Sequence, residues 1–170
     1  MASPSDLIAS AVLLAGTGAG AAIDLRTRRV PNPLTMGLAA TGVLFAAFGF
    51  GPISLGASLA GLALGLAVML PGHLIGATGA GDVKLFAAAG AFIGPGHIIG
   101  AFLYTALAGG GIAIIVSLLR RRLRQTVGST ALLIATVGAN APAIESPVED
   151  NRFAYAPAIA VGTMLAVLGM

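Results

Sequence analysis

Two aspartates stand at places in the sequence where an acidic side chain needs an explanation. Asp82 ends a glycine-rich stretch and is the first charged residue after Arg29. Asp24 follows an apolar run and precedes a cluster of arginines. An ionisable group beside long apolar segments of a membrane protein indicates function by default. The structural alternatives are a helix N-cap for Asp82 and an ion pair with a nearby arginine for Asp24.

Two carboxylates that share one site can act as a general acid and a general base. Because like charges at short distance do not both ionise easily, such a pair holds one proton between them. The ionised carboxylate can take a proton from water, and the protonated one can donate to a carbonyl oxygen or a leaving amine. This is the chemistry of aspartic peptide hydrolysis. It requires a fold that brings Asp24 and Asp82 together, because they lie far apart in the sequence.

Other residues near these acids have both a functional and a structural interpretation. Gly79 and Gly81 would let a substrate backbone approach closely, or they form a plain tight turn. Lys84 could tune an aspartate or bind a substrate carboxylate, or it anchors the chain at the membrane interface. His73 either lines an active-site cavity beside the two aspartates or is a hydrogen-bonded structural residue. His97 is expected on the opposite side of the membrane, so we expect no metal site and no cofactor.

The composition is that of a membrane protein. Of 170 residues, 57% are hydrophobic and only 9% are charged, whereas soluble domains carry roughly 25% charged residues. Residues 1–170 are therefore predicted to form a single membrane domain in a lipid bilayer. The absence of cysteine excludes disulfides, thiol catalysis and cysteine-ligated zinc. The arginines flank apolar segments, which argues against nucleic acid as a partner.

An all-α, polytopic fold with about six transmembrane helices is predicted. The apolar segments are 7–23, 34–50, 53–75, 83–93, 98–119 and 153–170, with a polar loop over 24–33. The fourth segment rises only about 17 Å, against a hydrocarbon core of about 30 Å, before Gly94-Pro95-Gly96 interrupts it. Either it starts inside the bilayer, with the glycine-rich loop dipping toward the membrane, or the Gly-Pro-Gly is only a kink in a longer span.

The distribution of basic residues predicts the orientation. With six spans and both termini external, all nine lysines and arginines fall on the cytoplasmic side, as the positive-inside rule requires. Both aspartates then lie at the cytoplasmic face. Residues 120–152 are expected to be a basic cytoplasmic loop that includes an interfacial helix.

Two motifs resemble those of the type IV prepilin peptidases, membrane aspartic proteases of the Gly-x-Gly-Asp class. The stretch Asp24-Leu-Arg-Thr-Arg-Arg-Val-Pro-Asn-Pro-Leu-Thr looks like the family's first-aspartate loop. Gly79-Ala-Gly-Asp-Val-Lys-Leu looks like its second-aspartate motif. A weaker match is Tyr155-Ala-Pro-Ala-Ile-Ala-Val-Gly, which is similar to the start of the family's last span.

The resemblance implies that Asp24 and Asp82 are catalytic, without a metal, in a plasma-membrane (inner-membrane) endopeptidase. It implies cleavage of prepilin and pseudopilin leaders at the cytoplasmic face and contact with other pilus assembly proteins. Larger members carry a Cys-x-x-Cys domain associated with N-methylation, so this chain looks like the short form of tight-adherence (Flp) pilus systems, without methyltransferase activity. Substrate-binding or supporting residues would be Pro31, Asn32, Gly79, Gly81 and Lys84.

Two other functions remain open from the sequence. A proton-coupled transporter would use the two acids as a proton relay, but transporters usually place such acids mid-span and often contain internal repeats. A non-catalytic pilus assembly platform would use them only as caps and ion-pair partners.

Overall fold

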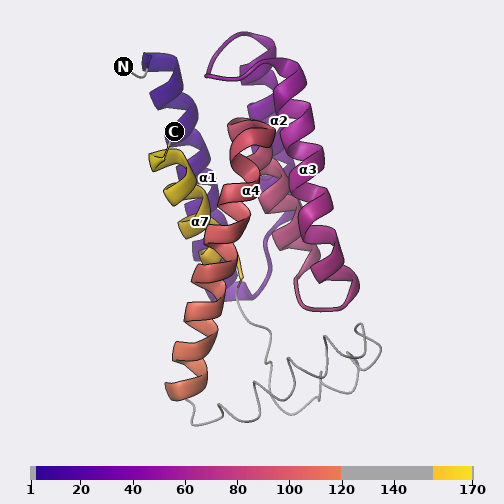
Figure 1. The fold of residues 1–170 in the computed structure, drawn as a ribbon, viewed down its shortest axis with the longest axis vertical. Helices are drawn as coiled ribbons and strands as arrows, with labels where there is room; N and C mark the ends of the chain where they lie inside the picture. Colours follow the sequence, from indigo (N-terminus) through magenta and orange to yellow (C-terminus); the bar gives the residue numbers. More distant parts are fainter. Residues whose placement is uncertain (1–2, 120–154, 170) are drawn as a thin grey trace.

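The structure is a computed structural model that describes residues 3–119 and 155–169. Nearly all of these residues are in helices (Figure 1). No strand occurs among these residues. The helices are α1 (Pro4–Thr27), α2 (Asn32–Ala47), α3 (Leu55–Leu74), α4 (Ala80–Leu119) and α7 (Ala156–Leu168). The all-α prediction is confirmed. The predicted basic loop and interfacial helix of 120–152 lie outside the described residues.

The helix α4 consists of two helical arms that run in opposite directions. Gly94 between them has φ 71° and ψ 177°, which is not helical. Phe86 precedes Gly94 in the sequence and Phe102 follows it, yet the centroids of their two rings are only 6.2 Å apart. In a continuous helix, residues this far apart in sequence would be separated by about 24 Å. The chain therefore reverses at Gly94, and the alternative of a kink in one longer span is wrong.

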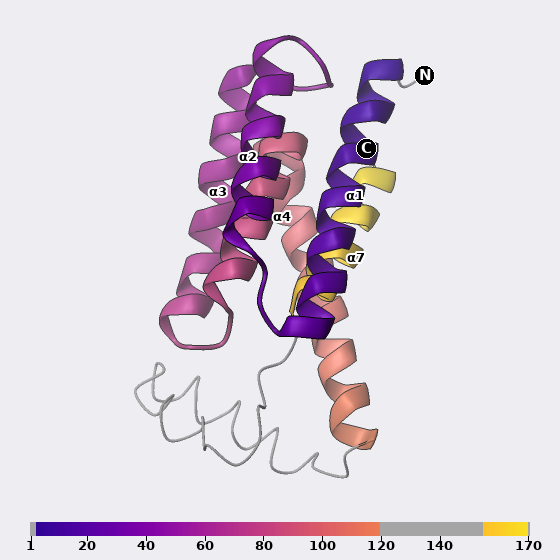
Figure 2. The same cartoon turned by 180° about the vertical axis from the view of Figure 1, so that it is seen from behind.

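These two arms have different lengths. The ascending arm, residues 80–93, rises about 21 Å at 1.5 Å per residue, and the descending arm, residues 95–119, about 37 Å. Figures 1 and 2 show the end of the descending arm extending past the loop that joins α3 to α4. The short fourth segment predicted from the sequence is thus a separate helix beside a much longer partner.

The prediction of a polar loop over 24–33 is wrong at both ends of this range, because each end is helical. The first helix continues to Thr27, and Arg28 ends it in a left-handed conformation with φ 55°. The second helix begins at Asn32, because Pro33 is tolerated in the first turn of a helix. Hydropathy marks where polar residues begin, which is not where a helix ends. Asp24 is therefore a helical residue, one turn from the end of α1.

By length and composition, three helical stretches among the described residues could cross a membrane: α1, α3 and Ala80–Ile115, the last of which is divided by the reversal at Gly94. The helices α2 and α7 are apolar but shorter. Large hydrophobic side chains are exposed on the outside of the bundle, among them Phe48, Leu74 and Leu107. Such a surface is typical of contact with lipid. The structure and the composition agree on a membrane protein.

Glycines allow the helices to pack closely where they cross. Gly61 of α3 lies against the backbone of Gly90 and Gly94 in α4, and Gly162 of α7 lies against Thr105 of the descending arm. The ascending arm fills the centre of the bundle, where Leu85 and Phe86 are fully buried. The helix α7 packs against both α1 and α4, and the two ribbon views show it running beside α1 at one edge of the bundle (Figures 1 and 2). This packing brings the C-terminal end of α1, the start of α4 and the start of α7 to one end of the bundle.

Candidate active site

Asp24 is held by the first turn of a helix that is remote in sequence. Its side chain is 5% exposed, and its Oδ2 accepts a hydrogen bond of 3.2 Å from the backbone N–H of Ala156, the first residue of α7. A helix N-terminus carries a partial positive charge and unpaired N–H groups, so it stabilises a carboxylate. The positive charge of Arg28 also acts on Asp24. The ion-pair alternative thus accounts for only part of the surroundings of Asp24.

Asp82 is the third residue of α4 and is 8% exposed. Its Oδ2 accepts a hydrogen bond of 3.1 Å from the N–H of Gly79, whose carbonyl accepts the first N–H groups of the helix. The N-cap position therefore belongs to Gly79, and Asp82 closes the first turn from inside the helix. The other oxygen, Oδ1, is buried without a hydrogen-bond partner among the described residues. Helix capping explains one oxygen of this carboxylate and leaves the second unexplained.

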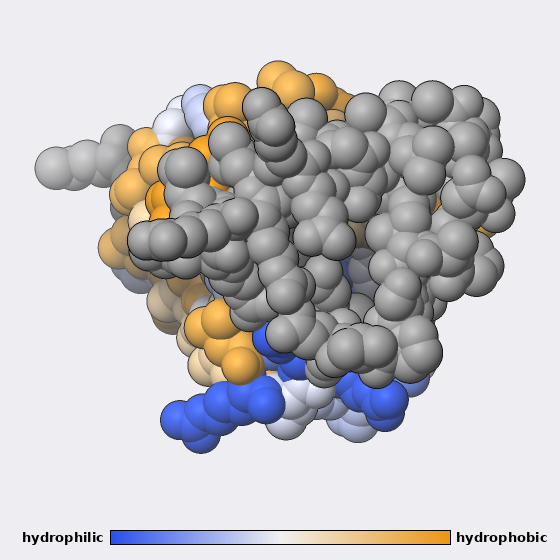
Figure 3. All heavy atoms as spheres, turned by 90° about the horizontal axis from the view of Figure 1, so that it is seen from below, coloured by the Kyte–Doolittle hydropathy of each residue, from blue (hydrophilic) through white to orange (hydrophobic). Residues whose placement is uncertain are grey.

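Both carboxylates line one cavity of about 210 Å³. The charge of Asp24 acts on Asp82, so the two acids lie within electrostatic reach of each other. Figure 3 views the molecule from this end, where hydrophilic residues gather along one side of the visible surface. The residues lining the cavity are Asp24, Arg28, Arg29, Val30, Gly79, Ala80, Gly81 and Asp82.

The two glycines of the second motif permit the close contacts that assemble this cavity. A Cβ at Gly79 would lie 3.0 Å from Asp82 Oδ2, so the absence of a side chain lets the carboxylate reach the backbone N–H. A Cβ at Gly81 would lie 3.0 Å from the Cβ of Val30 and 3.2 Å from its carbonyl oxygen. Val30 belongs to the loop after Asp24, so Gly81 is where the two motifs contact each other.

Lys84, Asn32 and Pro31 lie beside the cavity without lining it. The ammonium group of Lys84 donates a hydrogen bond of 2.9 Å to Oδ1 of Asn32, which links the second turn of α4 to the first residue of α2 at an exposed position. Pro31 stands at the N-cap of α2. The geometry supports a role in holding the two motifs together, and direct contact of these three residues with a substrate stays a prediction.

The histidines lie apart from each other. His73, in the last turn of α3, is hydrogen-bonded to the carbonyl of Thr78, at 3.0 Å from its Nδ1, and does not line the cavity. His97 is exposed just after the chain reversal at Gly94, at the opposite end of the ascending arm from Asp82. Within the described ranges, no three side chains of the metal-ligating types form a group. The hydrogen-bonded interpretation of His73 agrees with this geometry.

Sequence reasoning missed the contribution of the last helix. A backbone N–H such as that of Ala156 leaves no mark in the residue type, and the only signal was the weak motif match that begins at Tyr155. The ring of Tyr155 packs against Gly109 of the descending arm, where a Cβ would lie 2.8 Å from it. The last helix therefore helps to form this end of the bundle.

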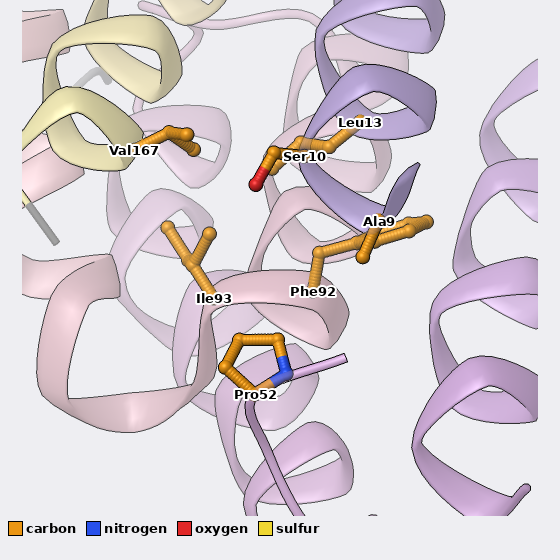
Figure 4. A pocket seen from close by; sticks show the side chains of 7 residues that line it. All are labelled: Ala9, Ser10, Leu13, Pro52, Phe92, Ile93 and Val167. Atoms are coloured by element: carbon orange, nitrogen blue, oxygen red, sulfur yellow. The ribbon is translucent and has the colours of Figure 1, made fainter. Parts of the chain in front are cut away.

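A second pocket lies at the opposite end of the bundle (Figure 4). Its volume of about 10 Å³ has room for about one water molecule. Its lining is mostly apolar and includes no acidic or basic side chain. The residues are Ala9, Ser10, Leu13, Pro52, Phe92, Ile93 and Val167. This pocket is too small to be a substrate site.

Comparison with known proteins agrees with the motifs. The model of the type IV leader peptidase family matches residues 11–114, which include both aspartates and end before α7. No match was found among curated proteins or among solved structures. With more than half of its length matched and both motif aspartates at one cavity, the chain belongs to the type IV leader peptidase family.

Proposed function

We propose that this chain is an aspartic endopeptidase that cleaves the leaders of Flp-type prepilins and related pseudopilins, with Asp24 and Asp82 as its catalytic pair. The observation that carries the proposal is the shared cavity: two buried carboxylates from distant parts of the sequence line the same space. The family supports a peptidase with prepilin-type substrates. The Flp-type substrate is supported by the resemblance to the short peptidases of tight-adherence systems.

The mechanism that fits this geometry is activation of water between two carboxylates. Each aspartate has one oxygen held by a backbone N–H, from Ala156 or from Gly79, which fixes the orientation of both side chains. An ionised carboxylate takes a proton from water, which attacks the scissile carbonyl carbon. The protonated partner donates its proton to the carbonyl oxygen, and the first carboxylate passes the proton that it took from water to the leaving amine. When the tetrahedral intermediate collapses, the proton on its oxygen returns to the partner, which restores the starting pair. The fixed orientation lowers the entropic part of the barrier, because the groups need not be ordered during the reaction.

The lengths of the arms of α4 support a site below the membrane surface. Since Phe86 lies beside Phe102, Asp82 lies at about the level of Ala106 in the antiparallel arm. The descending arm continues from Ala106 to Leu119 for about 20 Å, and it is apolar over this length. If this arm spans the bilayer, Asp82 lies near the middle of its length, about 20 Å from its cytoplasmic end, and the cavity must admit water from the cytoplasm. The proposal therefore includes six spans, external termini and a glycine-rich turn set into the membrane.

Purified protein in detergent tests the proposal directly when it is mixed with an Flp-type prepilin. We expect release of the leader and of the mature pilin, identified by mass spectrometry. A proton-coupled transporter would instead move protons in liposomes without cutting the prepilin, and an assembly platform would bind it intact. Failure to cut several Flp-type prepilins would contradict the proposed activity.

The depth of the cavity predicts slow labelling by water-soluble thiol reagents. Ala80 lines the cavity and is exposed to it, so an Ala80→Cys variant should react with a small hydrophilic maleimide. The reaction should be slower than that of Arg124→Cys in the predicted basic loop, because the reagent must enter the membrane layer. The wild type has no cysteine and provides the blank. Equal and fast labelling at both positions would place Asp82 on an ordinary surface loop.

The contact between the two motifs predicts that a single methyl group impairs the enzyme. In Gly81→Ala, the added Cβ must displace Val30 by a few tenths of an ångström, which shifts the loop after Asp24 relative to Asp82. We expect cleavage to fall about tenfold, because small misplacements in a catalytic site are costly. The matched control is Gly18→Ala, where a Cβ meets nothing within 4 Å. Equal activity of both variants would show that this contact is not required.

A further inference from the structure

The turn between α3 and α4, residues 75–79, is held by few groups. The carbonyl of Gly72 accepts hydrogen bonds from the N–H groups of Ala77, at 2.8 Å, and Thr78, at 3.2 Å. The N–H of Gly76, which has φ 77°, donates to the carbonyl of His73 at 3.0 Å. All of these bonds use backbone atoms and could form with other side chains present, apart from the conformation of Gly76.

The imidazole of His73 adds a side-chain hydrogen bond to this turn, next to the backbone N–H that binds Asp82. Its Nδ1 lies 3.0 Å from the carbonyl oxygen of Thr78. Because a carbonyl oxygen can only accept, Nδ1 carries the proton and donates it. A polar ring near the end of an otherwise apolar helix is costly to bury unless it makes such a bond.

The Thr78 carbonyl and the Gly79 N–H belong to one peptide group. This group is planar and trans, so its C=O and its N–H point in opposite directions. His73 holds the oxygen, and the N–H at the other side donates to Oδ2 of Asp82 at 3.1 Å. Rotation of this plane would break both hydrogen bonds together. The orientation of the Asp82 carboxylate is therefore connected to the His73 side chain through a single rigid unit.

We propose that His73 is a positioning residue, which orients the Thr78–Gly79 peptide so that its N–H holds the Asp82 carboxylate in the cavity. This inference rests on the proposed function only for its effect on cleavage. The structural part, a peptide group held from both sides, does not depend on any activity. His73 acts through the peptide and does not touch the substrate.

A pair of substitutions separates the hydrogen bond from the space that the ring fills. Asparagine has an amide N–H close to the position of Nδ1, whereas leucine has a similar size and no donor. We expect His73→Leu to lower kcat for prepilin cleavage by about tenfold or more with KM nearly unchanged, because orientation is lost while substrate binding remains. His73→Asn should keep most of the activity. His97→Leu, at the opposite end of the ascending arm, should behave like the wild type.

A second measurement follows the peptide itself and needs no substrate. Hydrogen–deuterium exchange over residues 75–82 should become faster in His73→Leu and remain slow in His73→Asn, while exchange in the middle of α3 stays unchanged in both. Equal behaviour of the two variants, in exchange and in kcat, would overturn the inference. A wild type that does not cut prepilins contradicts the proposed function alone, and the exchange result still decides the role of His73.

Discussion

Replacing either aspartate by asparagine is expected to abolish cleavage of an Flp-type prepilin. Asparagine cannot serve as the base and cannot donate a carboxyl proton, and neither acid can replace the other. Loss of one acid–base group costs about 10²–10⁴-fold in rate. The variants Asp24→Asn and Asp82→Asn should therefore leave only precursor on an immunoblot and show no leader release with purified protein.

The fold should survive these changes, which makes the test specific for chemistry. The amide oxygen of an asparagine can still accept the N–H of Ala156 at position 24 or the N–H of Gly79 at position 82. Membrane insertion and thermal stability in detergent should match those of the wild type. The control is Asp6→Asn, since Asp6 belongs to the capping box at the start of α1, at the opposite end of this helix from Asp24. Normal processing by either active-site variant would contradict the catalytic pair.

The sequence was informative where a residue is out of place in an apolar chain. Asp82 was visible because a long uncharged stretch precedes it. The short apolar segment before Gly94 indicated an interruption there, but the sequence left open whether this was a separate short segment or a kink in a longer span. The structure confirms an interruption at Gly94 and brings Asp24 and Asp82 to one cavity. Each of these predictions depended on a single strong physical penalty, from burying charge or from breaking a helix.

The remaining features depend on contacts between segments that no local pattern reveals. The end of α1 was misplaced because helix geometry continues through Asp24 to Thr27, past the limit of the apolar residues. The bond from Ala156 to Asp24 involves a backbone group, which every residue type except proline has. Gly81 suggested a tight turn or access for a substrate, whereas in the structure it makes room for Val30. Close packing and backbone donors become visible only in three dimensions.

The packing of α3 on α4 predicts a large effect of one methyl group far from the cavity. A Cβ at Gly61 would collide with the carbonyl oxygen of Gly90 and would lie 2.7 Å from the Cα of Gly94. These are backbone atoms just before the chain reversal and at it, so they cannot rotate away as a side chain can. In Gly61→Ala the two helices must separate, and overpacking of this kind costs about 1–3 kcal/mol. Thermal unfolding in detergent should show a lower melting temperature.

The same helix offers a matched control for this effect. At Gly56 of α3 a Cβ would meet nothing within 4 Å, so Gly56→Ala should leave stability unchanged or slightly increased, because alanine favours helix. In Gly61→Ala the ascending arm must also shift relative to α3, and this arm carries Asp82 at its start. Prepilin cleavage should therefore fall together with the melting temperature, while Gly56→Ala keeps both. If Gly61→Ala proves as stable and active as Gly56→Ala, the close crossing of α3 and α4 at Gly61 and Gly90 is incorrect.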